Sequence, residues 1–193
     1  MTDVRHASPR RPALLLALIL AVAGCARPGA DLPPLAEATE PVYRLGPGDQ
    51  VRVITFGQDQ LTGEFRVNDS GNLALPLLGS VHAAGLTTTR LETVIAGGLT
   101  RASLLQAPSV AVEVIEYRPI FVLGEVAKPG QFPYQPGMTV VTAVAVAGGF
   151  TYRAIEDYAG VVRTDNGTAM EGRAARNSFL RPGDVITVFE RRF

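Results

Sequence analysis

The sequence uses one phrase twice, as YRLGPGDQVRVITF at residues 43–56 and as FLRPGDVITVFERRF at residues 179–193. Proline fixes φ at the first central position of a turn, glycine supplies a positive φ, and an aspartate side chain can accept hydrogen bonds from nearby backbone N–H groups. The alternating residues that follow each phrase are typical of a strand. We therefore predict two structural turns that each lead into a strand, with the residues Pro47, Gly48, Asp49, Pro182, Gly183 and Asp184. A catalytic pair of Asp49 and Asp184 is the less favoured alternative.

Between the two phrases, the pattern predicts short strands near 64–67 and 73–76, joined by a hairpin at NDSGN. A helix is expected at 87–105, since apolar residues recur there at helical spacing, and a strand is expected at 107–117. The helix N-cap is either Thr87 or Thr89, the latter in a capping box with Glu92.

A second set of elements begins near residue 119 with an apolar strand and a turn. A short helix is expected at 137–150, with Thr139 near its start and Gly148 and Gly149 past its end. A hairpin turn at DNGT (165–168) and a final strand complete it. The fold class is therefore α+β, with two small mixed units at 43–118 and 119–193 that we expect to pack together.

The N-terminus has the pattern of a secretory leader. Three arginines precede LLLALILAVA (14–23), and ten helical residues rise only about 15 Å, too little for a bilayer core of about 30 Å. This predicts a signal peptide at 1–24. Residues 25–42 hold four prolines and predict a tether.

The single cysteine, Cys25, ends the phrase VAGC. This phrase resembles the bacterial lipobox, in which the thiol receives diacylglycerol and the leader is cut before the cysteine. The resemblance implies a lipoprotein held to the membrane through Cys25, with at least two acyl chains for stable anchoring. The alternative is a plain secretory leader with a chance cysteine.

Composition excludes several classes of protein. The formal net charge is +0 with no basic run, which argues against nucleic acid as a partner. One cysteine and two histidines cannot build a cysteine-rich metal site, and the common nucleophile, phosphate-loop and zinc motifs are missing. We expect no enzyme activity, no metal and no cofactor beyond the covalent lipid, and we expect His82 to be a surface or cross-strand residue.

Two further phrases, VLGEVAKPGQFPY (122–134) and AGGFTYRA (147–154), complete a pattern that covers nearly all of 41–190. This pattern resembles the outer-membrane polysaccharide export family of Wza and GumB. The resemblance implies a polysaccharide export domain at 43–118 and an SLBB domain, a β-grasp variant, at 119–193. It does not identify which residues contact the sugar.

The same resemblance implies a function. Such lipoproteins form homo-oligomeric rings at the periplasmic face of the outer membrane, conduct a capsular or exopolysaccharide chain, and dock on an inner-membrane polysaccharide co-polymerase. Longer members continue into a transmembrane helix after the last strand, so we expect a short form that passes polymer to a separate outer-membrane β-barrel. The alternative is a monomeric envelope lipoprotein that binds glycan or a partner protein without conducting polymer.

Overall fold

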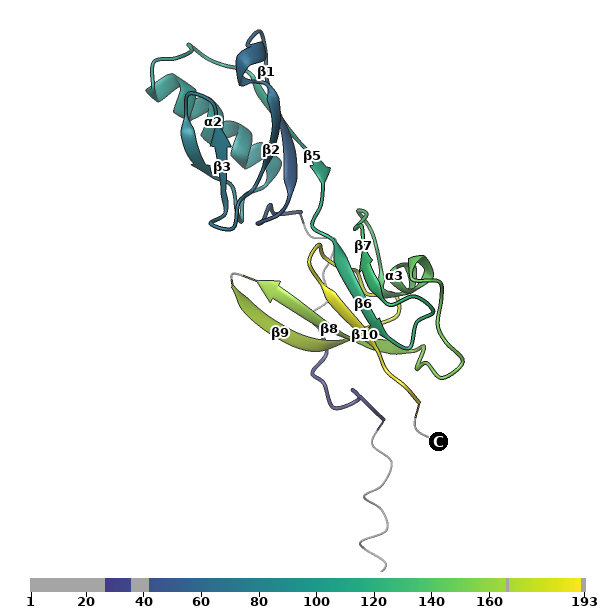
Figure 1. Cartoon of the computed structure of the whole chain (residues 1–193). Coiled ribbons are helices and arrows are strands. Elements are labelled where there is room, and N and C mark those ends of the chain that lie inside the picture. Colours follow the sequence, from purple (N-terminus) through teal and green to yellow (C-terminus); the bar gives the residue numbers. More distant parts are fainter. Residues whose placement is uncertain (1–26, 36–41, 166, 192–193) are drawn as a thin grey trace, which may run out of the picture.

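The computed structural model describes residues 27–35, 42–165 and 167–191. The predicted signal peptide, Cys25 and part of the predicted tether lie outside the described residues. The chain forms two lobes that meet at the short segment between strand β5 (Val110–Glu116) and strand β6 (Ile120–Gly124) (Figure 1). Both lobes mix strands with a helix, so the predicted α+β class is confirmed.

The first lobe contains a three-stranded antiparallel sheet in the order β2-β1-β5 and a separate two-stranded sheet, β3-β4. Its remaining elements are β1 (Gln50–Thr55), η2 (Asp59–Leu61), β2 (Gly63–Arg66), β3 (Asn72–Leu75), β4 (Gly79–His82) and helix α2 (Thr88–Arg101). His82 lies on β4 opposite Asn72, and its ring nitrogen contacts the Asn72 side-chain oxygen at 3.1 Å. The expectation of a cross-strand histidine is thus confirmed.

Helix α2 covers the first lobe's core with one apolar face. Leu91, Ile95 and Leu99 are buried at the helical spacing that the sequence predicted, and they share a cluster with Val51 and Val53 of β1. The hydroxyl of Thr87 accepts the N-terminal hydrogen bond from Arg90 N at 3.2 Å, so Thr87 is the N-cap.

Glu92 has a different role from the capping box considered for Thr89. Its carboxylate accepts a hydrogen bond from Val112 N at 3.0 Å. It thereby ties the helix to β5 instead of closing the helix terminus, and the capping box at Thr89 is wrong.

The predicted hairpin at NDSGN is also wrong. The turn itself closes, because the Asn68 side-chain oxygen accepts hydrogen bonds from Ser70 N and Asn72 N. Its two flanks then separate: β2 pairs with β1, whereas β3 pairs with β4. The local signal specified the turn, but sheet pairing chose other partners for both strands.

The second lobe is a five-stranded sheet in the order β7-β6-β10-β8-β9, with β6 and β10 parallel and the other pairs antiparallel. Its other elements are β7 (Gly130–Phe132), α3 (Val140–Val146), β8 (Tyr158–Asp165), β9 (Thr168–Ala175) and β10 (Val185–Val188). Helix α3 packs on one face through Val140, Ala143 and Val144.

Helix α3 is shorter than the predicted 137–150 segment because both of its ends are fixed by local signals. Thr139 and Thr142 form a reciprocal capping box at the N-terminus. Gly148 and Gly149 take φ values of +86° and +93° after the C-terminus, a conformation that an L side chain rarely adopts.

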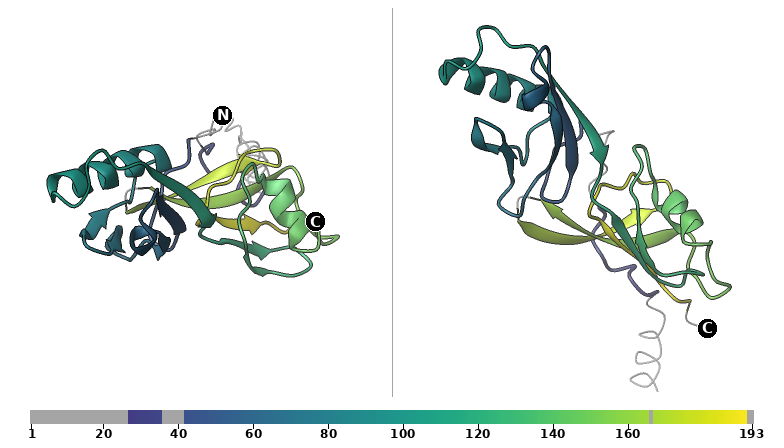
Figure 2. Two further views of the ribbon diagram at one scale, coloured as in Figure 1. Left: turned by 90° about the horizontal axis from the view of Figure 1, so that it is seen from above. Right: turned by 45° about the horizontal axis from the view of Figure 1, so that its top comes forward.

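Each lobe has its own hydrophobic core. One buried cluster runs from Leu45 to Val112 and the other from Ile120 to Val188. The views in Figure 2 keep α2 and α3 on opposite sides of the joint between the lobes. The two units that we expected to pack together meet at the connecting segment, where Tyr117 contacts Tyr134, but their cores stay separate.

The stretch from Pro28 to Leu35 docks on the second lobe. Leu35 N donates to Arg173 O at 2.8 Å, Arg173 N donates to Pro33 O at 2.7 Å, and the Tyr158 hydroxyl donates to Pro28 O at 2.8 Å. Leu35 also packs against the second core. Within the predicted tether, this stretch is therefore bound to the edge of strand β9. No helix in the described part of the chain is long and apolar enough to cross a membrane.

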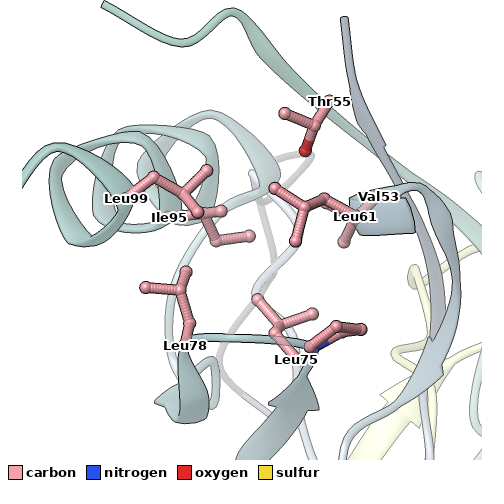
Figure 3. A pocket seen from close by; sticks show the side chains of 8 residues that line it. Val53, Thr55, Leu61, Leu75, Leu78, Ile95 and Leu99 are labelled. Atoms are coloured by element: carbon pink, nitrogen blue, oxygen red, sulfur yellow. The ribbon is translucent and has the colours of Figure 1, made fainter. Parts of the chain in front are cut away.

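Thr55 leaves a hydroxyl unsatisfied in the first core. The residue is 2% exposed, and its Oγ1 has no hydrogen-bond partner within the described ranges. It borders a cavity of about 10 Å³ that is otherwise lined by apolar side chains (Figure 3). Such a space is at the lower limit for one water molecule and offers it few polar partners.

We predict that Thr55→Val raises the free energy of unfolding by about 1 kcal/mol, since it replaces an unsatisfied hydroxyl with a methyl group of similar size. Urea unfolding measures the change. Val53 points to the same core from the same strand, so Val53→Thr is the matched control and should lower stability. A destabilised Thr55→Val variant would contradict the conclusion that the Thr55 hydroxyl is unsatisfied.

Candidate functional site

Asp49 closes the first Pro-Gly-Asp turn. Its carboxylate is 0% exposed, and Oδ2 accepts hydrogen bonds from Gly46 N at 2.7 Å and from the Tyr43 hydroxyl. Gly48 takes a φ of +97°, as the turn requires. The other oxygen, Oδ1, accepts from Arg118 N at 3.0 Å and pairs with Arg118 Nε at 3.3 Å.

Asp184 closes the second turn in the same way. It is 1% exposed, and Oδ2 accepts from Arg181 N at 2.8 Å. Arg163 on β8 donates from Nη2 to Oδ2 at 2.7 Å and from Nε to Oδ1 at 3.0 Å, which makes a bidentate ion pair. Gly183 has a φ of +89°.

The two turns therefore share one pattern of hydrogen bonds and ion pairing, although they lead into strands of different sheets. Each aspartate accepts a hydrogen bond from the N–H three residues before it and then binds an arginine from elsewhere in the chain. All four carboxylate oxygens are occupied by such donors. Neither Asp49 nor Asp184 is therefore available as a general acid or base in this arrangement.

Both turns also hold the segment that connects the lobes. Arg118 of this segment binds Asp49 through its backbone and its side chain. The next residue, Pro119, accepts a hydrogen bond from Gly183 N at 3.0 Å. Gly46 makes room for the arginine, because a Cβ at that position would lie 2.5 Å from Arg118 Nη1. The connecting segment is thus fixed from both sides.

A cleft of about 310 Å³ lies beside this segment. The end of β5, the connecting segment, β7 and the turn after β7 all contribute to its wall, so both lobes form it. We call it the joint cleft, and its lining residues are Ile115, Glu116, Tyr117, Pro119, Gln131, Phe132, Pro133 and Tyr134.

Three tyrosines form a row through the joint. The rings of Tyr43 and Tyr117 meet edge to face with centroids 4.9 Å apart, and those of Tyr117 and Tyr134 do so at 5.6 Å. The outer two hydroxyls are engaged, that of Tyr43 by Asp49 and that of Tyr134 by Leu180 O at 3.3 Å. The Tyr117 hydroxyl has no hydrogen-bond partner among the residues that the structure describes.

Burial raises the pKa of all three phenols above the ordinary value for tyrosine. For Tyr43, the hydrogen bond to the Asp49 carboxylate raises the pKa further, because the neutral phenol is the donor. These side chains therefore stay neutral at physiological pH and present hydroxyl groups and ring surface.

The joint cleft has the chemistry of a binding surface. Among the described residues that line it, the one charged side chain is that of Glu116, which pairs with Arg66 Nη2 at 2.9 Å on the exposed surface. Across the described ranges, no group of three or more histidine, cysteine, aspartate or glutamate side chains is placed to hold a metal ion. Aromatic rings, prolines and one amide are suited to contact a ligand without reacting with it.

Sequence reasoning missed Tyr117, Arg118, Tyr134 and Arg163. The run Tyr117-Arg118-Pro119 spans the predicted boundary between the units at residues 118 and 119, and that position was the available signal. The spacing of the tyrosines along the chain gave no sign that they meet. The predicted lipidation residue, Cys25, lies outside the described residues.

Family comparisons match both lobes. The model described as polysaccharide biosynthesis/export protein matches residues 37–115, and the SLBB domain model matches residues 119–174. The predicted SLBB domain is therefore confirmed. The boundary between the two matches falls at the connecting segment, which Asp49 and Gly183 hold through hydrogen bonds.

Three curated proteins are similar to this chain. The exopolysaccharide production protein ExoF of Rhizobium meliloti is 37% identical over 188 residues, covering 91% of this chain and 39% of that protein. The EPS I polysaccharide export outer membrane protein EpsA of Ralstonia nicotianae is 27% identical over 197 residues, covering 84% and 51%. The polysialic acid transport protein KpsD of Escherichia coli is 30% identical over 118 residues, covering 56% and 20%. The chain thus spans about half or less of these relatives.

We predict that the two buried aspartates differ in how much stability they contribute. Asp184→Asn should cost about 3–5 kcal/mol, because it leaves the Arg163 cation unpaired with a side chain only 6% exposed. Asp49→Asn should cost less, because the Arg118 side chain is 28% exposed and can reach water. Chemical unfolding of both variants measures the difference.

A double substitution separates charge from packing at the second turn. Arg163→Met combined with Asp184→Asn should be more stable than Asp184→Asn alone, since no buried charge is then left unpaired. A double variant no more stable than that single variant would show that the ion pair is not the source of the loss.

The raised pKa of Tyr43 predicts that the folded protein loses stability at alkaline pH. Its pKa is raised in the folded state, so the unfolded chain loses the phenolic proton first, near pH 10. Its contribution is complete below about pH 10 and is lost as pH rises toward the folded-state pKa. Urea unfolding between about pH 8 and 11 should show this fall, and Tyr43→Phe should make it shallower. An equal pH dependence of the unfolding free energy in wild type and Tyr43→Phe would show that Tyr43 is not the source of the loss.

Proposed function

Because this chain belongs to the polysaccharide export protein family, we propose that it takes part in moving a capsular or exopolysaccharide chain across the outer membrane. The observation that carries the proposal is the tandem match of an export domain and an SLBB domain, one on each lobe. The names of the similar proteins ExoF, EpsA and KpsD, which refer to production, export and transport of polysaccharides, support it.

The proposed role is conduction without covalent chemistry. The buried carboxylates are occupied by backbone and arginine donors, and the joint cleft presents rings and an amide. These features support a protein that contacts polymer and partners and leaves bonds intact.

We place the chain at the periplasmic face of the outer membrane, anchored by lipid on Cys25. The docked stretch supports this arrangement, because it begins at Pro28 and three residues span at most about 11 Å. An acylated Cys25 would hold the second lobe within that distance of the lipid surface and leave the first lobe farther away.

The proposed assembly is a homo-oligomeric ring, since a conduit needs closed symmetry. On the sheet face opposite α3, Phe121 and Leu123 are 37% and 44% exposed. Apolar surface of this kind favours contact with another chain. The proposed partners are the polysaccharide, an inner-membrane co-polymerase and a separate outer-membrane β-barrel.

The experiment is a gene deletion complemented with wild type or Cys25→Ser, with surface and periplasmic polysaccharide assayed separately. We expect deletion to remove surface polymer, wild type to restore it, and Cys25→Ser to fail while its protein level stays comparable. Unchanged surface polymer after deletion would overturn the export role and favour a monomeric lipoprotein that binds glycan or a partner.

A further inference from the structure

The joint cleft has a size and shape suited to a ligand. Its volume of about 310 Å³ falls at the small end of ligand sites, which typically measure about 300–1,000 Å³. Its walls come from the last residues of β5, from the connecting segment, and from β7 with the turn that follows. A ligand in the cleft would therefore touch both lobes at once.

The walls of the cleft are held rigidly. Pro119 and Pro133 each have a fixed φ, and Pro119 is held by the second turn through Gly183. Tyr117 is packed between two other rings. Rigid aromatic walls lose little conformational freedom on binding, and this favours even a weak ligand.

The lining of the cleft disfavours anionic ligands. Among the described residues, no lysine or arginine lines it, and its one charged lining side chain is the carboxylate of Glu116, which is already paired with Arg66 at 2.9 Å. A phosphate or a carboxylated sugar would therefore lose hydration without an unpaired cation in the wall to compensate for it. A neutral ligand avoids this cost.

The polar and apolar groups of the cleft match those of a sugar ring. The apolar C–H face of a pyranose carries slight positive charge and packs on the negative face of an aromatic ring, here Tyr117, Phe132 or Tyr134. Its hydroxyl groups need donors and acceptors at the edge. The Gln131 amide, the free Tyr117 hydroxyl and the Glu116 carboxylate supply both kinds.

We propose that the joint cleft is a binding subsite for one neutral sugar residue of the exported polysaccharide. This proposal rests on the export function proposed above. Binding is weak, in the millimolar range, because a few hydrogen bonds and stacked rings cover only one unit of the chain. Weak contact is what conduction requires, since a tightly held polymer would not leave.

The experiment follows tyrosine fluorescence in the purified chain as sugar is added. The chain has five tyrosines and no tryptophan, so its emission comes from tyrosine, including Tyr117 and Tyr134 in the cleft. The probes are neutral oligosaccharides from partial hydrolysis of the producing strain's own polysaccharide. We expect a saturable change in emission at millimolar concentrations.

Three variants test the location of binding. Gln131→Ala and Tyr117→Phe should each weaken binding about three- to tenfold, since each removes one hydrogen-bonding group and leaves the walls in place. Gln135→Ala is the matched control, because Gln135 is exposed nearby and does not line the cleft, and it should bind like wild type. An oligogalacturonate should bind more weakly than the neutral probe.

Several results would overturn the subsite. They are the absence of a saturable change in wild type, equal affinity in Gln131→Ala and Gln135→Ala, or tighter binding of the oligogalacturonate. Failure of the export role is read separately, from polymer location in the deletion strain. If the purified chain binds the oligosaccharide but deletion leaves the surface polymer unchanged, the sugar subsite stands and the export role is rejected. If deletion removes the surface polymer but the purified chain does not bind, the export role stands and the subsite is rejected.

Discussion

The structure depends on one constraint, the pair of contacts that hold the segment joining the lobes. We call these contacts, Asp49 with Arg118 and Gly183 with Pro119, the clamp. Arg118 is bound to the buried Asp49 of the first turn, and Pro119 is bound to Gly183 of the second. The lobes have separate cores, so no shared core holds them together. Their relative position rests on the row of tyrosine rings at the joint together with directional hydrogen bonds and an ion pair, which fix geometry more closely than apolar contact does.

The clamp also explains where the cleft lies. With residues 118 and 119 held, Tyr117 is fixed between Tyr43 of the first lobe and Tyr134 of the second. The end of β5 and the strand β7 then face each other across the same segment. A repeated turn that looks purely structural thus builds a surface to which both lobes contribute.

The two turns use the same aspartate at different electrostatic cost. Arg163 and Asp184 are both buried, so their desolvation must be offset by a bidentate pair and a backbone donor. Arg118 keeps contact with water, so its pair with Asp49 is less costly and also less strong. The second turn consequently stabilises its own lobe, whereas the first turn serves mainly to position the joint.

The sequence by itself determined the elements whose signals are local. It specified the turn chemistry of both Pro-Gly-Asp phrases, the apolar face of α2, the caps of α3 and the α+β class, because these depend on residues only a few positions apart. Tertiary structure decided what depends on distant partners: β2 pairing with β1 instead of β3, the docking of residues 28–35 on β9, and the meeting of the three tyrosines. Strand pairing and side-chain packing join segments up to about 140 positions apart, and no local pattern carries that information.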